Sequence, residues 1–413
     1  MESINKNLQI EFIDGGVCAP QGFLANGIHC GIRKNKSKRD LALIYSETIC
    51  AAAAVYTQNL VFGAPIAVTK ESLANGSARA VICNSGIANT CNADGLEKAR
   101  AMRDITANGL DVSAGDIIIA STGVIGQPLN LEPVANGMDE LVAGLSASGS
   151  DFAAQAIMTT DTRKKEYAVQ FEINGKTCNI GAIAKGSGMI CPNMATMLCF
   201  ITTDTAIAAP MLKSALEAAA ADSFNMLSID GDTSTNDMAS IMANGQAGNE
   251  PIETDTAEYE IFKSALMTLC IKVAKEMARD GEGATKLVEC IISGATDDNA
   301  AKVMAKSVIN SALVKTAMFG ADANWGRILC AMGYAGVWLD VNSVGIAFKS
   351  AGGTIEVCKN GAALEFSEEK AAKVLAEAEI VIDITLRDGT GCASAFGCDF
   401  SYDYVKINGD YRT

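Results

Sequence analysis

Apolar residues recur along this chain in the two periods that distinguish strands from helices. Between Glu166 and Ile173 every second residue is apolar, which predicts a strand with one buried face. The Asn174-Gly175 pair that follows is typical of a type I′ hairpin turn, so a second strand is expected to run back towards Ala184. A buried strand is also predicted for the apolar run from Met197 to Ile201.

Helical spacing appears in two other parts of the sequence. Apolar residues recur at this spacing within 138–145, and a long amphipathic helix is predicted over 255–279. The helix ends at the glycine-bearing segment 280–283. Residues 116–120 form a short apolar strand, which we expect to close in a turn at Ser121-Thr122-Gly123.

The C-terminal third also mixes the two kinds of element. We expect strands at 287–292, 379–386 and 398–405, a hairpin turn at Asn360-Gly361 and a helix capped by Ser367. Most of these strands are joined by hairpins, which favours antiparallel pairing. The sequence therefore predicts an α+β protein.

We place a domain boundary near residue 285, which divides the chain into a larger domain, 1–285, and a smaller C-terminal α+β domain, 286–413. The chain has 413 residues, of which 49% are hydrophobic and only 7 are proline, a composition typical of a folded enzyme. A net charge of −15 argues against nucleic acid or an anionic membrane as a partner. No apolar run reaches the roughly 20 residues of a membrane helix, and 1–16 lacks the apolar core of a signal peptide, so we expect a cytoplasmic protein.

Two residue types limit the chemistry. The 14 cysteines are scattered without a Cys-x-x-Cys pair, which favours reduced thiols that pack as small apolar residues over a zinc or iron–sulfur site. His29 is the only histidine. A Ser-His-Asp triad or a Cys-His pair would have to use it, and zinc hydrolases with two histidine ligands are excluded.

The segment Lys185–Phe200 is the strongest candidate for catalysis. A glycine-bearing loop ends in Ala195, which is followed by Thr196 and a buried strand. A threonine released at a new N-terminus carries its own general base, the α-amine, and needs no histidine. The plain alternative is a Gly-Ser loop that leads into a core strand.

Four further polar glycine-rich segments lie elsewhere in the chain. Ser121-Thr122-Gly123 suits an oxyanion hole or a simple β-turn. The segment 230–237 is too polar for a core and suits the wall of a polar pocket. In 280–286 the Glu282 carboxylate lies between two glycines, where it could meet a substrate cation. The tail 405–413 is either a frayed end or part of a site.

Taken together, these segments resemble the ornithine acetyltransferase (glutamate N-acetyltransferase) family of arginine biosynthesis. The resemblance covers essentially the whole chain. Its motifs, in chain order, are 15–23, 84–86, 121–126, 159–162, 185–200, 230–237, 280–286, 324–327 and the Tyr-Arg-Thr ending.

The resemblance implies self-cleavage between Ala195 and Thr196, which gives the chains 1–195 and 196–413. These chains are expected to remain associated as a heterotetramer with two copies of each. It also implies a layered α/β/β/α sandwich like that of self-processing aminopeptidases in the larger, catalytic domain.

The resemblance also implies the site residues. Thr196 is the nucleophile, and Thr122 and Gly123 form the oxyanion hole. Substrate contacts are expected from Thr159, Lys185, Thr196, Glu282, Asn408 and Thr413. Within the motif 159–162, Thr159 is our choice for the contact.

The implied reaction moves the acetyl group from N2-acetyl-L-ornithine to L-glutamate through an acetyl-Thr196 intermediate. No metal or cofactor is implied, and acetyl-CoA as a second acetyl donor, which would make the enzyme multifunctional, stays open. One alternative is a self-processing amidase or aminopeptidase with water as the acceptor. Another is a protein that binds metal or an iron–sulfur cluster through its cysteines.

Overall fold

The computed structural model describes residues 9–191 and 197–410, which form two compact units. The first unit takes in 1–186, 193–224 and 233–273, and the second takes in 187–192, 225–232 and 274–413. The chain therefore passes between the units several times, once inside the long helix α7 (Ala257–Arg279). A single boundary near residue 285 would assign 187–192 and 225–232 to the first domain, whereas they belong to the second unit.

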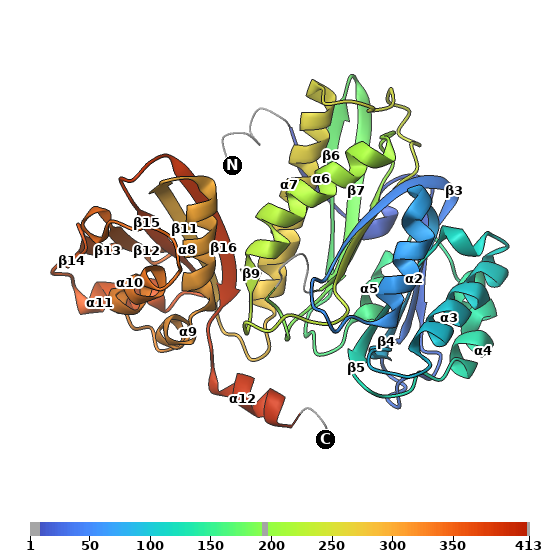
Figure 1. The fold of residues 1–413 in the computed structure, drawn as a ribbon, viewed down its shortest axis with the longest axis horizontal. Helices are drawn as coiled ribbons and strands as arrows, with labels where there is room; N and C mark the ends of the chain where they lie inside the picture. Colours follow the sequence, from blue (N-terminus) through green and yellow to red (C-terminus); the bar gives the residue numbers. More distant parts are fainter. Residues whose placement is uncertain (1–8, 192–196, 411–413) are drawn as a thin grey trace. The chain divides into compact units, whose positions relative to one another are not determined.

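The first unit is built on one mixed sheet, which has nine strands in the described part of the chain. Its order is β1-β6-β7-β8-β10-β3-β4-β5, and β2 pairs with β3 beside this path (Figure 1). The strands are β1 (Glu11–Ile13), β2 (Phe23–Ile28), β3 (Leu41–Tyr56), β4 (Ser77–Ile87), β5 (Ile117–Val124), β6 (Lys165–Ile173), β7 (Lys176–Lys185), β8 (Leu198–Thr203) and β10 (Met238–Ala243).

The predicted hairpin is confirmed as the pair β6 and β7, which are antiparallel from Lys165 opposite Ala184 to Ile173 opposite Lys176. Asn174 and Gly175 both have positive φ, as a type I′ turn requires. Because the turn sets the register, β7 ends at Lys185, as the sequence predicted.

The long strand β3 divides the sheet into two halves. Its register against β4 shifts between Tyr45 and Cys50. β4 pairs with β3 within 41–51, and β10 pairs with residues 51–56. One core cluster joins Ile44 of the first half to Ile183 and Phe200 of the second half. The two halves therefore pack face to face.

Helices cover both outer faces of this double layer. They are α2 (Ala64–Ser72), α3 (Gly95–Leu110), α4 (Glu132–Ala143), α6 (Ala209–Asp222) and α7, while α5 (Ser150–Ile157) contacts β2, β3 and β7. Figure 1 shows α2, α3 and α4 together on one side, where Met102 and Met138 pack onto Ile82 and Ile119 of the sheet. On the other outer face, Phe262 of α7 lies 6.3 Å from Phe171, measured between ring centroids. The α/β/β/α sandwich is therefore confirmed.

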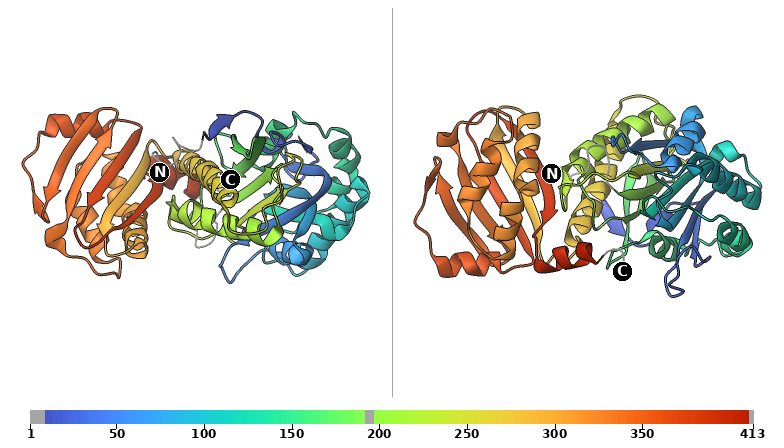
Figure 2. Two further views of the ribbon diagram at one scale, coloured as in Figure 1. Left: turned by 90° about the horizontal axis from the view of Figure 1, so that it is seen from above. Right: turned by 60° about the horizontal axis from the view of Figure 1, so that its bottom comes forward.

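The second unit is a seven-stranded sheet, counted over the described residues, with helices against it. The strand order is β14-β13-β12-β15-β11-β16-β9, and Figure 2 shows α8 across this sheet, where it contacts β11 and β16. The strands are β9 (Leu227–Ser228), β11 (Leu287–Ala295), β12 (Gly345–Ser350), β13 (Gly353–Lys359), β14 (Ala362–Ala363), β15 (Glu379–Thr385) and β16 (Gly391–Cys398). The helices are α8 (Asp298–Asn310), α9 (Ala312–Phe319), α10 (Trp325–Gly333), α11 (Glu368–Leu375) and α12 (Tyr402–Gly409).

The strand predicted for 398–405 is wrong. β16 ends at Cys398, and the chain then forms α12. The Ser401 side chain caps this helix by accepting a hydrogen bond from the Asp403 N–H. Phe400, which precedes the helix, stacks on Tyr404 in its first turn with the ring centroids 4.8 Å apart.

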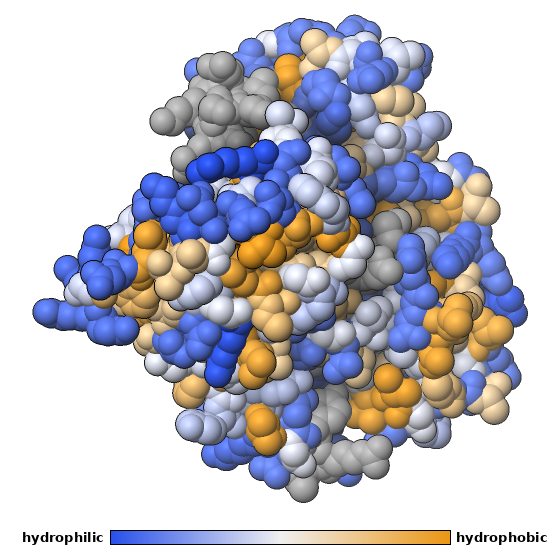
Figure 3. Space-filling model, turned by 60° about the vertical axis from the view of Figure 1, so that its left-hand side comes forward, coloured by the Kyte–Doolittle hydropathy of each residue, from blue (hydrophilic) through white to orange (hydrophobic). Residues whose placement is uncertain are grey.

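The 14 cysteines are free, and eight of them are buried. Burial raises the pKa of the Cys50 and Cys83 thiols to about 12, so these thiols remain protonated near neutral pH. This supports the interpretation that most cysteines serve as small apolar core residues. Within the described residues, every helix is too short or too polar to cross a membrane. The face drawn in Figure 3 has hydrophobic side chains interspersed with hydrophilic ones.

Candidate functional site

The predicted oxyanion residues lie in the parallel pair β4 and β5, where Thr122 and Gly123 are opposite Ser85 and Gly86. Ser121-Thr122-Gly123 does not form the predicted turn, because β5 continues through these residues to Val124. Gly123 has φ +131°, and a Cβ at this position would overlap the Gly86 carbonyl group. Only glycine allows this close backbone approach.

The buried side chain of Asn236, in the segment 233–273 of the first unit, hydrogen-bonds to the same part of β5. Asn236 Nδ2 donates hydrogen bonds to the carbonyl oxygens of Ser121, at 2.9 Å, and Ala88, at 2.6 Å. Its Oδ1 accepts one from the Thr90 hydroxyl at 2.6 Å. Buried amide groups that satisfy several partners in this way hold backbone segments rigidly. Asn236 therefore fixes the backbone of β5 at Ser121, the residue before Thr122.

Lys185 lies at the end of β7, and its side chain is partly exposed. Among the described residues, its ammonium group has no hydrogen-bond or ion-pair partner. Its charge favours the ionised form of three side chains of the first unit, Asp161, Asp237 and Cys83, although burial still raises the pKa of Asp237 and of Cys83. Cys83 belongs to β4, the strand that also carries Gly86. The Lys185 ammonium group is thus a candidate partner for a carboxylate.

Asp161 is a buried carboxylate from the motif 159–162, and it binds three groups. Its Oδ1 accepts hydrogen bonds from the Lys165 ammonium and the Gly186 N–H, both at 2.7 Å, and its Oδ2 accepts one from the Thr159 N–H at 2.9 Å. Burial alone would raise the pKa of Asp161, but the Lys165 and Lys185 charges and these hydrogen bonds outweigh it and hold the pKa well below its usual range. Asp161 is therefore ionised near neutral pH.

Two strands meet beside the predicted cleavage position. Met238 at the start of β10 donates its N–H to the Met197 carbonyl at 2.8 Å, and Met238 is opposite Leu198 in the parallel pair. Ala195 and Thr196 lie outside the described residues. Since Thr196 immediately precedes Met197 in the chain, the predicted nucleophile adjoins the first residues of this strand pair.

The residue before β10, Asp237, carries a buried carboxyl group. Its Oδ2 has no hydrogen-bond partner in the described part of the chain. Burial raises the pKa of Asp237 well above its usual range, against the opposing effects of the Ser234 side chain, the Lys185 charge and the Thr57 side chain. The segment predicted as a polar pocket wall thus places an acid at the start of β10, beside the strand that follows Thr196.

Glu282, the predicted ligand for a substrate cation, lies in the second unit with little of it exposed. Its N–H donates to the Ser187 carbonyl at 2.8 Å, so the loop after α7 is tied to the segment that follows β7. Gly188 lies so close that a Cβ there would overlap the Glu282 carboxylate. The glycine therefore leaves the space in which the carboxylate sits.

The C-terminal helix α12 reaches the same carboxylate. Asn408 Nδ2 donates a hydrogen bond to Glu282 Oε2 at 2.8 Å, so the structure brings these two predicted site residues together. The helix is fixed at its base by the stacking of Tyr404 on Phe400 and by an edge contact between the Tyr402 and Phe319 rings, whose centroids are 5.5 Å apart. Up to Gly409 the tail is therefore helical, and it contacts Glu282 through Asn408. Thr413 lies outside the described residues.

Asp230 belongs to the second unit and caps the loop 189–190. Its carboxylate accepts hydrogen bonds from the Met189 and Ile190 N–H groups, at 2.6 and 2.9 Å. Burial raises the pKa of Asp230, although these hydrogen bonds oppose the rise. Since 233–237 belongs to the first unit, the wall predicted over 230–237 is divided between two compact units.

His29 has a partner that the sequence did not reveal. Its Nδ1 lies 2.9 Å from the Lys38 carbonyl oxygen and 3.3 Å from Asp40 Oδ2. Asp40 also accepts hydrogen bonds from the backbone N–H groups of Cys30 and Arg33, so this carboxylate closes the loop 28–40. The contacts of His29 thus stabilise the loop 28–40, and none of them involves a predicted site residue. No group of three or more His, Cys, Asp or Glu side chains that could hold a metal ion occurs among residues 9–191 and 197–410.

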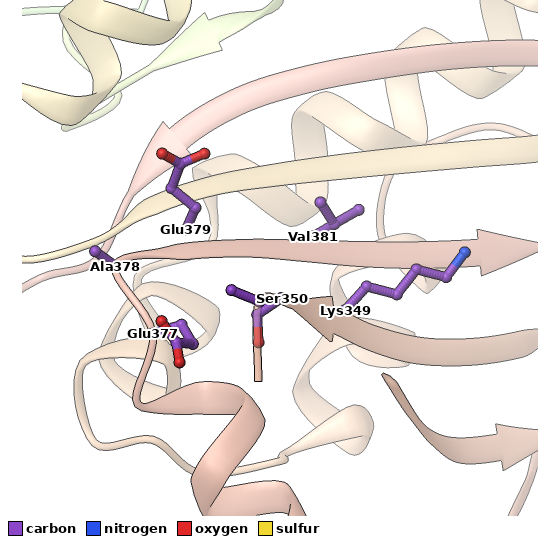
Figure 4. Close-up of a pocket in the computed structure, with 7 residues that line it drawn as sticks. Lys349, Ser350, Glu377, Ala378, Glu379 and Val381 are labelled. Atoms are coloured by element: carbon purple, nitrogen blue, oxygen red, sulfur yellow. The ribbon is translucent and has the colours of Figure 1, made fainter. Parts of the chain in front are cut away.

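A surface cavity of about 590 Å³ lies elsewhere in the second unit, along β12 and β15 (Figure 4). It is lined by Lys349, Ser350, Ala351, Glu377, Ala378, Glu379 and Val381. Its charged groups include Lys349, which pairs with Asp383, and Glu379, which pairs with Arg279. None of the predicted site residues lines this cavity.

Sequence reasoning missed the residues that hold the site in place. Asp161 and Asn236 occur inside recognised motifs, but Asp161 also binds Gly186, 25 positions away, and Asn236 binds Ser121, 115 positions away. The signal that could have found Asp161 is the lone carboxylate of Thr-Thr-Asp-Thr, with a lysine four residues later.

Comparison with known proteins assigns the family. The ArgJ family model matches residues 24–413. The chain is 47% identical over 405 residues to the arginine biosynthesis bifunctional protein ArgJ of Caldanaerobacter subterraneus, covering 98% of this chain and 100% of that protein. It is 47% identical to the Bacillus subtilis protein of the same name, covering 98% of each. The crystal structure of the Bacillus halodurans ArgJ is 45% identical, with a TM-score of 0.49, and matches 51% of this chain and 98% of the solved chain. The full-length identity and the family match show that this chain belongs to the ArgJ family.

Proposed function

We propose that this chain is a glutamate N-acetyltransferase of arginine biosynthesis, which moves the acetyl group from N2-acetyl-L-ornithine to L-glutamate. The observation that carries this proposal is the match along nearly the whole chain to bifunctional ArgJ proteins of arginine biosynthesis. The chemistry of three groups supports it: the Gly123 N–H suits an oxyanion, the Lys185 ammonium group suits a carboxylate, and the Glu282 carboxylate suits an ammonium group.

Catalysis begins with self-cleavage. The Thr196 hydroxyl attacks the Ala195 carbonyl carbon, the peptide bond rearranges to an ester, and water hydrolyses the ester to release the Thr196 α-amine. An α-amine has an unperturbed pKa of about 7.7–8.0, so a useful fraction is neutral near pH 7 and can act as a general base. The absence of a second histidine in the sequence fits a nucleophile that supplies its own base.

Acetyl transfer then follows in two half-reactions. Thr196 Oγ attacks the acetyl carbonyl of N-acetylornithine, ornithine leaves as the free amine, and the acetyl group remains as an ester on Thr196. The amine of glutamate attacks this ester, the bond between Thr196 Oγ and the acetyl carbon breaks, and N-acetylglutamate leaves while the Thr196 hydroxyl is restored. The Thr122 hydroxyl and the Gly123 N–H are the proposed donors to the oxyanion of each tetrahedral intermediate.

Substrate recognition is divided by charge. Both N-acetylornithine and glutamate carry an α-carboxylate next to the reacting nitrogen, so Lys185 and Thr159 are proposed to bind the part that the substrates share. Ornithine alone ends in an ammonium group, for which the Glu282 carboxylate is the proposed partner, with Asn408 and Thr413 beside it. Among residues 9–191 and 197–410, the Asn408 amide binds one Glu282 oxygen, Oε2, and the other oxygen is the proposed acceptor for the cation.

The remaining features belong to the same proposal. We propose a cytoplasmic heterotetramer of two copies each of 1–195 and 196–413, which needs no metal or cofactor. Exposed apolar side chains such as Trp338 and Leu313 support contact with further subunits. Acetyl-CoA is the proposed second acetyl donor, because the relatives are named bifunctional.

Incubation with N-acetylornithine separates transfer from hydrolysis. With glutamate present, we expect N-acetylglutamate and ornithine in equal amounts, and parallel lines in double-reciprocal plots, because the acetyl-enzyme forms before glutamate binds. Free acetate formed at the same rate without glutamate would instead show an amidase, and intersecting lines would contradict the covalent relay. Replacing N-acetylornithine by acetyl-CoA in the same assay tests the second donor.

Glu282 provides a test of the divided recognition. We expect Glu282→Gln to raise the KM for N-acetylornithine by about tenfold or more, because a charge-assisted hydrogen bond to the ammonium group is lost. The KM for glutamate, which has no such group, should change much less. Gln keeps the shape of the side chain and an oxygen for Asn408. An unchanged KM for N-acetylornithine would show that another group binds the ammonium.

A further inference from the structure

We propose that Asp161 is a positioning residue for substrate binding, whose carboxylate fixes both Thr159 and the end of β7 that carries Lys185. This inference rests on the proposed function, in which Thr159 and Lys185 contact the substrates. Asp161 itself touches neither substrate in this proposal. Its effect is to hold two separate chain segments in one arrangement.

The geometry links the two segments through a single side chain. The Thr159 N–H comes from the loop between α5 and β6, and the Gly186 N–H comes from the residue after β7. Each donates to a different oxygen of Asp161, at 2.9 and 2.7 Å. A carboxylate that accepts N–H groups on both oxygens cannot rotate without breaking one of these hydrogen bonds. The loop and the strand end are therefore fixed relative to each other.

Lys165 anchors this carboxylate to the sheet. Its ammonium group donates to Asp161 Oδ1 at 2.7 Å and to the Arg163 carbonyl at 3.3 Å, and both side chains of the ion pair are almost fully buried. Lys165 is the first residue of β6, where it is opposite Ala184 in β7. The ion pair thus ties Asp161 to the hairpin one residue before Lys185.

Lys185 needs support from a neighbouring group, because its side chain is long and makes no hydrogen bond to the described residues. Its direction is set by the backbone at the end of β7 and by the charges around it. Asp161 acts on both, since it binds the next N–H along the chain and its charge attracts the ammonium group. An ammonium group held in this way loses less conformational entropy when it binds a substrate carboxylate.

The test compares a double variant with a single one. Asp161→Asn alone removes one charge of a buried ion pair, and this variant is at risk of failing to fold. The double variant Asp161→Asn/Lys165→Met removes both charges and therefore keeps the interior neutral. The matched control is Lys165→Met, in which the Thr159 and Gly186 N–H groups and the Lys185 charge still favour the Asp161 carboxylate. Thermal unfolding and self-cleavage are measured first, to establish that both variants fold.

In the double variant we expect the KM for both N-acetylornithine and glutamate to rise by about tenfold or more, with a smaller change in kcat, because the affected contacts bind the part common to both substrates. Lys165→Met should raise both KM values less than the double variant does, because the Asp161 hydrogen bonds to Thr159 and Gly186 remain. Equal KM values in the double variant and in Lys165→Met would show that Asp161 only neutralises Lys165, and would overturn the inference.

Amide hydrogen exchange gives a readout that does not depend on turnover. We expect the Thr159 and Gly186 amides to exchange about tenfold faster in the double variant than in Lys165→Met, because each amide loses a charged acceptor. If the wild-type enzyme formed no N-acetylglutamate, the proposed function would fail, while the exchange rates would still decide whether Asp161 holds both segments. Unchanged exchange at both amides would contradict the proposed anchoring.

Discussion

Thr196→Ala is expected to yield a single full-length chain that transfers no acetyl groups. The hydroxyl of Thr196 is proposed to cut the chain and then to carry the acetyl group, so its loss removes both reactions together. Removal of a covalent nucleophile reduces turnover by about four orders of magnitude or more in well-studied enzymes. Denaturing electrophoresis and an acetyl-transfer assay of the purified variant measure both effects.

Thr196→Ser is the matched control, because it keeps a hydroxyl at the same position. We expect this variant to cleave more slowly, to show the N-terminal sequence Ser-Met-Leu on its second chain, and to retain measurable transfer. An uncut Thr196→Ala protein with full activity would mean that neither the hydroxyl nor the new N-terminus is needed. A cut Thr196→Ala protein would place the cleavage chemistry elsewhere.

Local signals in the sequence were sufficient for the part of the site on β7. Strict alternation over 166–173 and the Asn174-Gly175 turn define a hairpin without help from the rest of the chain, and the length of the second strand then places Lys185 at its end. The same holds for the helix capped by Ser367, whose side chain accepts a hydrogen bond from the Lys370 N–H. Elements whose stabilising contacts are close in sequence can be predicted from that sequence.

Other parts depend on contacts with distant segments. Ser121-Thr122-Gly123 has the composition of a turn, yet it continues as strand because β4 offers a parallel partner with Gly86 opposite Gly123. Tyr402 and Tyr404 alternate as in a strand, but the Ser401 cap and the Phe400–Tyr404 stack favour a helix. Asp161 is one carboxylate among many until the fold brings the Gly186 N–H to it. These features follow from tertiary pairing, which no local pattern contains.

The oxyanion assignment leads to the second large effect. Thr122→Ala should lower kcat by about 100- to 1000-fold, because one preorganised donor to the tetrahedral intermediate is removed. Thr122→Ser keeps the hydroxyl and should remain within about tenfold of the wild type. Both variants should fold, since the backbone of β5 is held by its pairing with β4 and by the Asn236 hydrogen bond to Ser121.

In this pair of variants, the half-reactions with N-acetylornithine and with glutamate should slow to a similar extent. This result would distinguish a donor to the oxyanion from a residue that binds the substrate. The same oxyanion forms in both half-reactions, so the loss of the Thr122 hydroxyl should slow the formation and the breakdown of the acetyl-enzyme while the KM values for N-acetylornithine and glutamate change little. Rapid mixing that measures each half-reaction provides this comparison. A rise in KM with unchanged kcat would show that Thr122 binds the ground state of the substrate. The oxyanion would then depend on the Gly123 N–H, whose position is fixed by its close approach to Gly86.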